Sequence, residues 1–228
     1  MKKLVIIPAF NEAGSIKKTI QDIRENASDY DYLIINDCST DATLEICKEE
    51  KYHYINLPVN LGIGGAVQTG YMYAYWNDYD IAVQFDGDGQ HSAIFLDAMC
   101  NALQEKEADM IIGSRFISNE GFQSSGMRRA GIRFLSFLIK LVTGTRVTDP
   151  TSGMRMINRK LIKEFATDYP KDYPEPESVV VALMGKNEVA EIPVIMNERE
   201  EGISSISPLK SIYYMIKVSL AVIIARFR

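Results

Sequence analysis

The sequence predicts an α/β protein built on a doubly wound, mostly parallel sheet, and three features of the chain lead to this prediction. Apolar, β-type runs alternate with helical patterns from residue 3 to residue 116. Carboxylate residues follow several of these runs directly, as Asp86 follows the run 79–85. A length of 228 residues is enough for one domain with a sizeable core.

The expected elements alternate regularly as far as Phe116. Side-chain periodicity and flanking turn residues predict strands at 3–10, 30–37, 52–58, 79–85 and 108–116, and helices at 12–26, 39–50, 62–77 and 91–105. Ser39 or Thr40 is expected to cap the second of these helices.

After Phe116 the pattern changes. A Gly/Ser-rich loop, 118–126, leads into a basic amphipathic helix over 127–144, in which apolar positions such as Ile132, Leu135 and Ile139 recur at helical spacing between arginines and lysines. The remaining segments are expected to be a loop at 145–155, a helix near 159–166, a turn-rich stretch at 169–178, a short helix, a strand at 189–196 and a loop at 199–208.

The C-terminal stretch 211–225 has fifteen residues and a single charge, Lys217. A membrane span needs about 20 apolar residues, so this stretch is too short to cross a bilayer. We expect an interfacial or partner-binding helix at 207–228, following a domain at 1–206; a core or dimer helix is the alternative.

Charge is distributed unevenly along the chain, whose net charge is −5. Residues 126–160 carry eight Lys and Arg against one acidic residue, Asp149, and residues 208–228 carry four against none. This segregation predicts a basic face for an anionic partner on an otherwise acidic protein, although scattered, solvated basic residues would give the same counts. We expect no nucleic-acid partner.

Three cysteines, Cys38, Cys47 and Cys100, form no CxxC pair and are odd in number, and the N-terminus has too short an apolar core for a signal peptide. Both features predict a reducing, cytoplasmic compartment.

The segment "DGDGQH", residues 86–91, places two carboxylates one residue apart at the end of a strand. Asp86, Asp88 and Gln90 offer hard oxygen ligands that suit Mg²⁺ or Mn²⁺ bound together with a diphosphate. A calcium loop fits poorly, because His91 occupies the position where that loop needs glycine. Two aspartates in an ordinary surface turn remain the simpler alternative.

Two further carboxylates follow other predicted strands. Glu12 ends the first strand and Asp37 ends the second. Ligands of open parallel sheets bind beyond the carboxyl ends of the strands, so Glu12, Asp37 and the aspartate pair should share one rim. A carboxylate such as Asp37 accepts hydrogen bonds from the N–H groups of uracil or guanine, which predicts a nucleotide diphosphate together with a metal ion.

An ordered set of motifs resembles a known family. The segments "VIIPAFNE", "IINDCSTDAT", "NLGIGGAVQTG", "DGDGQH", "GSRF" and "TDPTSGMR" are similar to those of family-2 inverting glycosyltransferases of the GT-A fold, in the branch that makes polyprenyl-phosphate sugars, of the dolichyl-phosphate mannose synthase type. The resemblance runs from residue 4 to about residue 206.

This resemblance implies roles for individual residues. Those expected to bind the nucleotide-sugar donor are Pro8, Phe10, Glu12, Asp37, Gly65 and Asp86, and those expected to hold Mg²⁺ or Mn²⁺ are Asp86, Asp88 and Gln90. The arginines expected to line the donor diphosphate and the acceptor phosphate are Arg115, Arg129, Arg155 and Arg199. Together with Asp88 they form the expected catalytic set. "GISSI" lacks the lysine that often follows the last arginine in the family, and the transmembrane helices that some members append are not expected here.

The expected reaction is an in-line displacement at the anomeric carbon of the sugar. A polyprenyl (undecaprenyl) phosphate acceptor needs no protein base, because a phosphate monoester with a second pKa of about 6 is largely ionised at neutral pH. A sugar hydroxyl acceptor would need one, with Glu175, Glu177 and Asp149 as candidates. A non-catalytic nucleotide-binding scaffold is a further alternative, whereas a nucleotidylyltransferase is disfavoured because "IPAFNEAGS" lacks a glycine-rich Thr-Arg loop.

Family analogy favours UDP-hexose or UDP-N-acetylhexosamine as the donor and cell-envelope glycan synthesis as the context. The expected location is peripheral, on the inner face of the cell membrane. A small integral-membrane subunit or a second copy of the chain would be alternative partners of the C-terminal helix.

Overall fold

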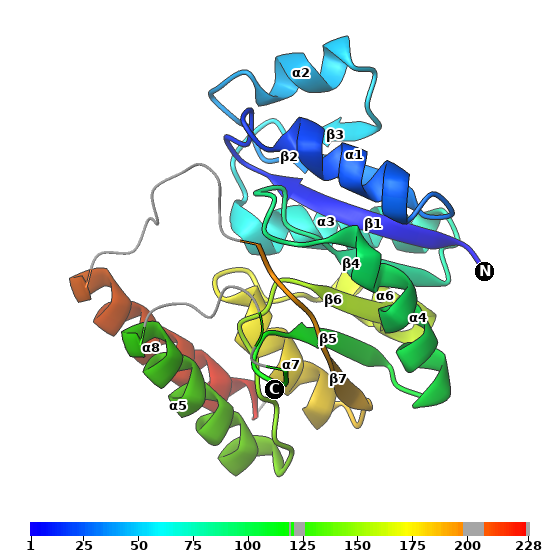
Figure 1. Cartoon of the computed structure of the whole chain (residues 1–228). Coiled ribbons are helices and arrows are strands. Elements are labelled where there is room, and N and C mark those ends of the chain that lie inside the picture. Colours follow the sequence, from blue (N-terminus) through cyan, green and yellow to red (C-terminus); the bar gives the residue numbers. More distant parts are fainter. Residues whose placement is uncertain (119, 121–125, 198–207, 227–228) are drawn as a thin grey trace.

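The computed structural model describes residues 1–118, 120, 126–197 and 208–226. A seven-stranded sheet with the order β3-β2-β1-β4-β6-β5-β7 forms its centre (Figure 1). The strands are β1 (Lys3–Ala9), β2 (Asp31–Asn36), β3 (Tyr54–Asn56), β4 (Ile81–Gln84), β5 (Met110–Ser114), β6 (Arg155–Asn158) and β7 (Val189–Pro193).

All strand pairings are parallel except those of β6, which runs antiparallel to both β4 and β5. The predicted mostly parallel α/β architecture is therefore confirmed. A loop was expected to run as far as Arg155, with no strand after it. This expectation is wrong, because Arg155 is the first residue of β6. The strand has only four residues and follows a turn-rich segment, so its sequence carries little periodicity.

The helices cover both faces of the sheet. Their bounds are α1 (Ile16–Asn26), α2 (Thr43–Glu49), α3 (Gly62–Trp76), α4 (Leu96–Glu105), α5 (Gly126–Thr143), α6 (Arg159–Thr167), α7 (Pro174–Met184) and α8 (Pro208–Ala225), with a short 3-10 turn at Ala93–Phe95. Along β1, Leu4 and Ile6 belong to the core shared with α3 and α6, whereas Val5 and Ile7 belong to the core shared with α1 and α4. Burial on both faces explains why the strands read as continuous apolar runs.

The predicted cap of α2 is wrong. Ala42 occupies the N-cap position without a side-chain hydrogen bond, and Ser39 instead accepts a hydrogen bond from the Asn11 backbone N–H at 3.0 Å. Asp41 accepts hydrogen bonds from the Ala13 N–H at 3.1 Å and the Thr43 N–H at 2.9 Å. These polar residues join the loop after β1 to the loop after β2, which fixes the rim where the predicted nucleotide residues lie.

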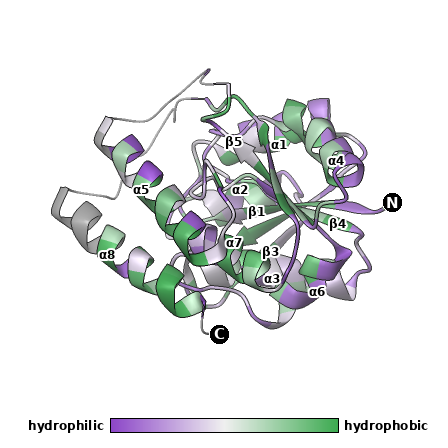
Figure 2. Cartoon of the chain, turned by 90° about the horizontal axis from the view of Figure 1, so that it is seen from below, coloured by the Kyte–Doolittle hydropathy of each residue, from purple (hydrophilic) through white to green (hydrophobic). Residues whose placement is uncertain are grey.

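The helix α8 packs on α5 and α7 (Figures 1 and 2). Val218, Val222 and Ala225 are buried in the same core cluster as Leu135 and Ile139 of α5. Among the residues that the structure describes, no helix is both long and apolar enough to cross a membrane. The division of the chain at residue 206 stays a prediction, and the inner side of α8 belongs to the main core.

The outer faces of α5 and α8 carry exposed aliphatic and aromatic side chains. We call this set the α5/α8 apolar surface; it consists of Phe134, Phe137, Leu141, Ile216, Leu220, Ile223 and Ile224. Basic residues of the same two helices, Arg128, Arg129, Arg133, Lys140 and Lys217, are also exposed.

Candidate functional site

Three parallel strands bring the residues that are predicted to bind the nucleotide to one rim of the sheet. Asp37 follows β2, is 3% exposed, and accepts a hydrogen bond from the Leu61 N–H at 2.7 Å through Oδ1. Its backbone N–H donates to the Ala9 carbonyl at the end of β1. The Asp37 carboxylate is thereby oriented by the first residues of α3, as a fixed hydrogen-bond acceptor at the carboxyl end of the sheet.

The end of β1 supplies the other residues predicted to contact a base or ribose. Pro8 is buried in the strand, whereas the Phe10 ring is 47% exposed just beyond it. Glu12 is partly exposed and accepts a hydrogen bond from the Ser15 hydroxyl at 2.8 Å. An exposed ring and a fixed carboxylate at the ends of neighbouring strands offer a stacking surface and a hydrogen-bond acceptor, two kinds of contact that a nucleobase can use.

His91 holds the first aspartate of "DGDGQH". The Asp86 backbone N–H donates to His91 Nδ1 at 3.0 Å, so in the neutral ring the hydrogen is on Nε2, which lies 3.6 Å from Asp86 Oδ2. His91 is 4% exposed and packs edge-on against Phe85. The imidazole therefore positions the backbone of Asp86 and lies close to its carboxylate.

The second aspartate faces α1. Asp88 Oδ1 accepts the Gln90 N–H at 3.0 Å, and the side chain lines a cavity of about 170 Å³ with Ser15, Lys18 and Asp22. Asn197 closes this loop from the end of the chain segment that follows β7. Its backbone N–H donates to the Gln90 carbonyl at 2.9 Å.

The carboxylates fit a divalent ion that takes most of its ligands from elsewhere. Within the described part of the chain, no three acidic, histidine or cysteine side chains gather as a metal cluster. Mg²⁺ and Mn²⁺ commonly bind one or two carboxylates and complete their shell with phosphate oxygens and water. A Cβ at Gly153 would lie 2.3 Å from Asp86 Oδ2, so the glycine of "SGMR" leaves the space that this carboxylate occupies.

Arg115 is paired inside the protein. Its guanidinium donates to Asp149 through Nε and Nη2, both at 2.7 Å, and to the Thr151 hydroxyl at 2.9 Å. Arg115 is 7% exposed and Asp149 is fully buried. This geometry supports a structural role for the arginine and removes Asp149 as a candidate base, because the carboxylate is enclosed and paired.

Arg155 is also engaged with the protein. It is 1% exposed and donates to the carbonyls of Ser152 and Pro150 at 2.7 Å, to the Ser178 hydroxyl at 2.7 Å and to the Glu175 carbonyl. A residue expected to contact phosphate therefore ties the loop 150–153 and the first turn of α7 to β6.

The other predicted residues are spread more widely. Arg129 is exposed on α5, and no described contact joins it to the aspartates. Gly65 lies in the first turn of α3, where a Cβ would meet Leu61 at 2.5 Å, so its requirement for glycine comes from packing at the helix start. Arg199 lies outside the described residues.

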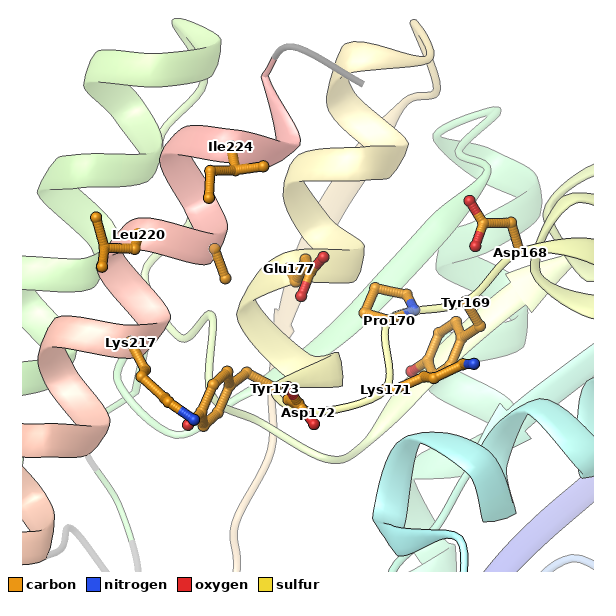
Figure 3. Close-up of a pocket in the computed structure, with 11 residues that line it drawn as sticks. Asp168, Tyr169, Pro170, Lys171, Asp172, Tyr173, Glu177, Lys217, Leu220 and Ile224 are labelled. Carbon is orange, nitrogen blue, oxygen red and sulfur yellow. The ribbon is translucent and has the colours of Figure 1, made fainter.

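A cavity of about 460 Å³ lies between α8, the first turn of α7 and the loop 168–173 (Figure 3). Its walls hold none of the residues predicted to bind donor or metal. One wall is aliphatic, with Leu220 and Ile224, and Glu177 lies on the side of α7.

The sequence did not indicate how three residues support this site. Asn197 reaches "DGDGQH" from a distant segment that no local pattern marks, and the motif "TDPTSGMR" includes Gly153 without showing that it lies against Asp86. Glu175 was named as a candidate base but was expected in a loop. It lies instead in the first turn of α7, and Pro174 at the helix start was an available signal.

Comparisons with known proteins identify the family. The family model for glycosyl transferase family 2 matches residues 4–165. A UDP-N-acetylglucosamine–dolichyl-phosphate N-acetylglucosaminyltransferase of Methanococcus voltae is 29% identical, with 83% of each chain covered. An undecaprenyl-phosphate mannosyltransferase of Micrococcus luteus is 28% identical, over 91% of this chain and 88% of that one.

Among solved structures, a glucosyl-3-phosphoglycerate synthase of Mycobacterium tuberculosis, in complex with Mn²⁺, UDP-glucose and phosphoglyceric acid, superposes with a TM-score of 0.72 over 99% of this chain and 79% of that one. Its sequence is 18% identical, so this similarity concerns the fold, which is the GT-A fold.

Proposed function

Because the chain belongs to glycosyltransferase family 2, we propose that it transfers a sugar from a nucleotide diphosphate to a polyprenyl phosphate. The observation that carries this proposal is the similarity of 83–91% of the chain to enzymes named for dolichyl-phosphate and undecaprenyl-phosphate acceptors. The rim formed by Asp37, Glu12 and Asp86 supports it with a fixed base acceptor and carboxylates for a diphosphate site.

The donor in this proposal is a UDP-sugar. Asp37 accepts the imide N–H of uracil, and Phe10 offers its ring to the base. A relative named for UDP-N-acetylglucosamine supports this assignment.

The residues that would hold Mg²⁺ or Mn²⁺ beside the diphosphate are Asp86, Asp88 and Gln90. Such an ion, when bound, stabilises the charge that develops on the departing nucleotide diphosphate. Gln84 orients the Asp86 carboxylate for this contact, since its amide donates to Oδ1 at 3.3 Å, and His91 holds the backbone of Asp86 by accepting its N–H.

The acceptor phosphate acts as the nucleophile without a protein base. It is already ionised at neutral pH, and the enclosed Asp149 has no access to it. Exposed cations attract and orient this dianion, and Arg129 in the first turns of α5 is the described candidate. Arg199 is proposed for the same role from the family resemblance.

We also place the enzyme peripherally on the inner face of the membrane, where a polyprenyl acceptor resides. The α5/α8 apolar surface offers side chains for the acyl region, and the basic residues of these helices face anionic headgroups. Each such basic residue contributes about 1 kcal/mol.

A radiolabel assay tests the proposal. UDP-glucose, UDP-N-acetylglucosamine and GDP-mannose, each labelled in the sugar, are incubated with undecaprenyl phosphate and Mn²⁺. Label from one donor should pass into organic solvent, and EDTA should abolish the transfer. Label that stays in water with every donor, while a soluble glycan acceptor is glycosylated, would overturn the polyprenyl-phosphate assignment.

A further inference from the structure

Glu175 lies beside the predicted diphosphate site, although the proposed reaction uses no base. It belongs to the first turn of α7, where the helix dipole favours a carboxylate. Its backbone carbonyl accepts a hydrogen bond from Arg155, whose guanidinium also donates to Ser178 of the same helix at 2.7 Å. The start of α7 is therefore fixed to β6.

The sheet register places this turn next to β4. Arg155 is the β6 partner of Gln84, and the Gln84 amide lies two residues before Asp86, to which it donates. Burial raises the pKa of Glu175, the Arg155 charge opposes this effect and the Asp86 charge adds to it. Glu175 as a residue is half-buried, at the point where the first turn of α7 meets β6.

A carboxylate in this place has two possible uses in a sugar transfer. As a base it would lie beside the attacking group, but a negative charge there repels an incoming phosphate dianion. As an acceptor it binds the hydroxyl groups of the sugar, whose neutral O–H donors suit a carboxylate with no hydrogen to donate. The second use agrees with a phosphate nucleophile.

We propose that Glu175, in the helix turn whose backbone Arg155 holds, is a specificity residue that accepts hydrogen bonds from hydroxyl groups of the donor sugar. This inference rests on the proposed function, both for the nucleotide sugar and for the phosphate nucleophile that makes a base unnecessary, whereas the binding test needs no acceptor. Arg155 acts as a positioning residue for the turn that carries this carboxylate.

Binding without an acceptor tests the inference. Calorimetry in the presence of Mn²⁺ first identifies which nucleotide sugar binds the wild-type protein: UDP-glucose, UDP-N-acetylglucosamine or GDP-mannose. The affinity for this nucleotide sugar is then compared with the affinity for its own nucleoside diphosphate, UDP or GDP. Glu175→Gln should weaken nucleotide-sugar binding about tenfold or more, because a hydrogen bond to a charged group is lost, and should leave nucleoside-diphosphate binding unchanged. Glu175→Ala should behave alike.

Two controls make the result specific. Glu177→Gln changes the neighbouring carboxylate, which faces the cavity beside α8 (Figure 3), and should leave both affinities unchanged. Deoxy analogues of the donor sugar supply the second control. For the analogue that lacks the contacted hydroxyl, wild type and Glu175→Gln should bind equally.

Other outcomes overturn the inference. Unchanged nucleotide-sugar affinity with lost turnover would make Glu175 a base, and equal losses for nucleotide sugar and nucleotide would place its effect at the diphosphate site. If no nucleotide sugar binds the wild-type protein, the proposed function itself fails. Circular dichroism and thermal unfolding confirm that each variant is folded before its affinities are compared.

Discussion

Asp88 and Arg115 were predicted from the same family motifs, yet their surroundings differ. Asp88 borders a cavity next to α1, whereas Arg115 is enclosed with Asp149. Local sequence identified the aspartates because both follow a strand whose end must lie on the rim. It could not show that Arg115 pairs with Asp149, because residues 34 positions apart meet only through the tertiary structure.

Asp88→Asn should abolish most turnover and leave the fold intact. The amide oxygen can still accept the Gln90 N–H, but an amide is a weak substitute for an anionic metal ligand. Mn²⁺ binding, followed by electron paramagnetic resonance, should weaken in parallel with activity. Asp22→Asn is the matched control, since Asp22 lines the same cavity and accepts the Ala93 N–H at 2.7 Å. Survival of activity in both EDTA and Asp88→Asn would exclude a metal role.

Arg115→Ala should lower the free energy of unfolding by about 3 kcal/mol or more, because it leaves the Asp149 carboxylate buried without its partner. Urea unfolding measures this change. Arg129→Ala, at an exposed position, should leave stability unchanged and raise the KM for the acceptor. An Arg115→Ala protein of wild-type stability that fails only in acceptor use would restore Arg115 to direct phosphate contact.

At the scale of elements, the strands and helices before Phe116 were predictable because each has a strong period and clear turn residues. The strand β6 was not predictable, because its four residues lie between a loop and a helix and carry no clear pattern. Its antiparallel direction is set by its pairing with β4 and β5, which the local sequence does not show. Asp109, just before β5, shows how the end of β6 is held beside its neighbours. It accepts hydrogen bonds from Asn158 at 2.8 Å, from the Glu188 N–H at 2.9 Å and from Lys160 at 3.2 Å.

These contacts predict a pH-dependent stability. Burial opposes the charge of Asp109, but the hydrogen bonds outweigh it and lower its pKa in the folded state. A lowered folded pKa stabilises the protein above the unfolded value of about 3.9, and this stabilisation is lost as pH falls through the folded pKa. Asp109→Asn should therefore cost about 2 kcal/mol at pH 7, and its difference from wild type should shrink below about pH 4. A difference that is constant from pH 7 to pH 3 in urea unfolding would contradict this prediction.

At the scale of the whole molecule, the sheet carries the nucleotide rim and the layer of α5, α7 and α8 carries the apolar surface (Figures 1 and 2). The sequence predicted an interfacial C-terminal helix but could not show that its inner side joins the core through Val218 and Val222. Removing 208–228 would therefore expose that core. Point changes on the outer side test membrane contact more cleanly.

Phe137→Ser combined with Leu220→Ser should reduce sedimentation with anionic liposomes, because both side chains lie more than half exposed on the α5/α8 apolar surface. The same protein should lose activity on a long polyprenyl phosphate and keep it on a short, water-soluble prenyl phosphate. Trp76→Ser, which removes an equally exposed ring from the end of α3, is the control and should sediment like wild type. Unchanged sedimentation of the double variant would contradict membrane contact and would favour a partner chain as the occupant of this surface.

If the sugar is joined to the phosphate of the lipid, phosphorus NMR should record the new bond. With donor and Mn²⁺, the monoester signal of undecaprenyl phosphate should be replaced by a phosphodiester signal as nucleoside diphosphate accumulates. Asp88→Asn should leave the monoester signal unchanged. A monoester signal that persists while wild-type protein consumes the donor and glycosylates a hydroxyl acceptor would contradict the account.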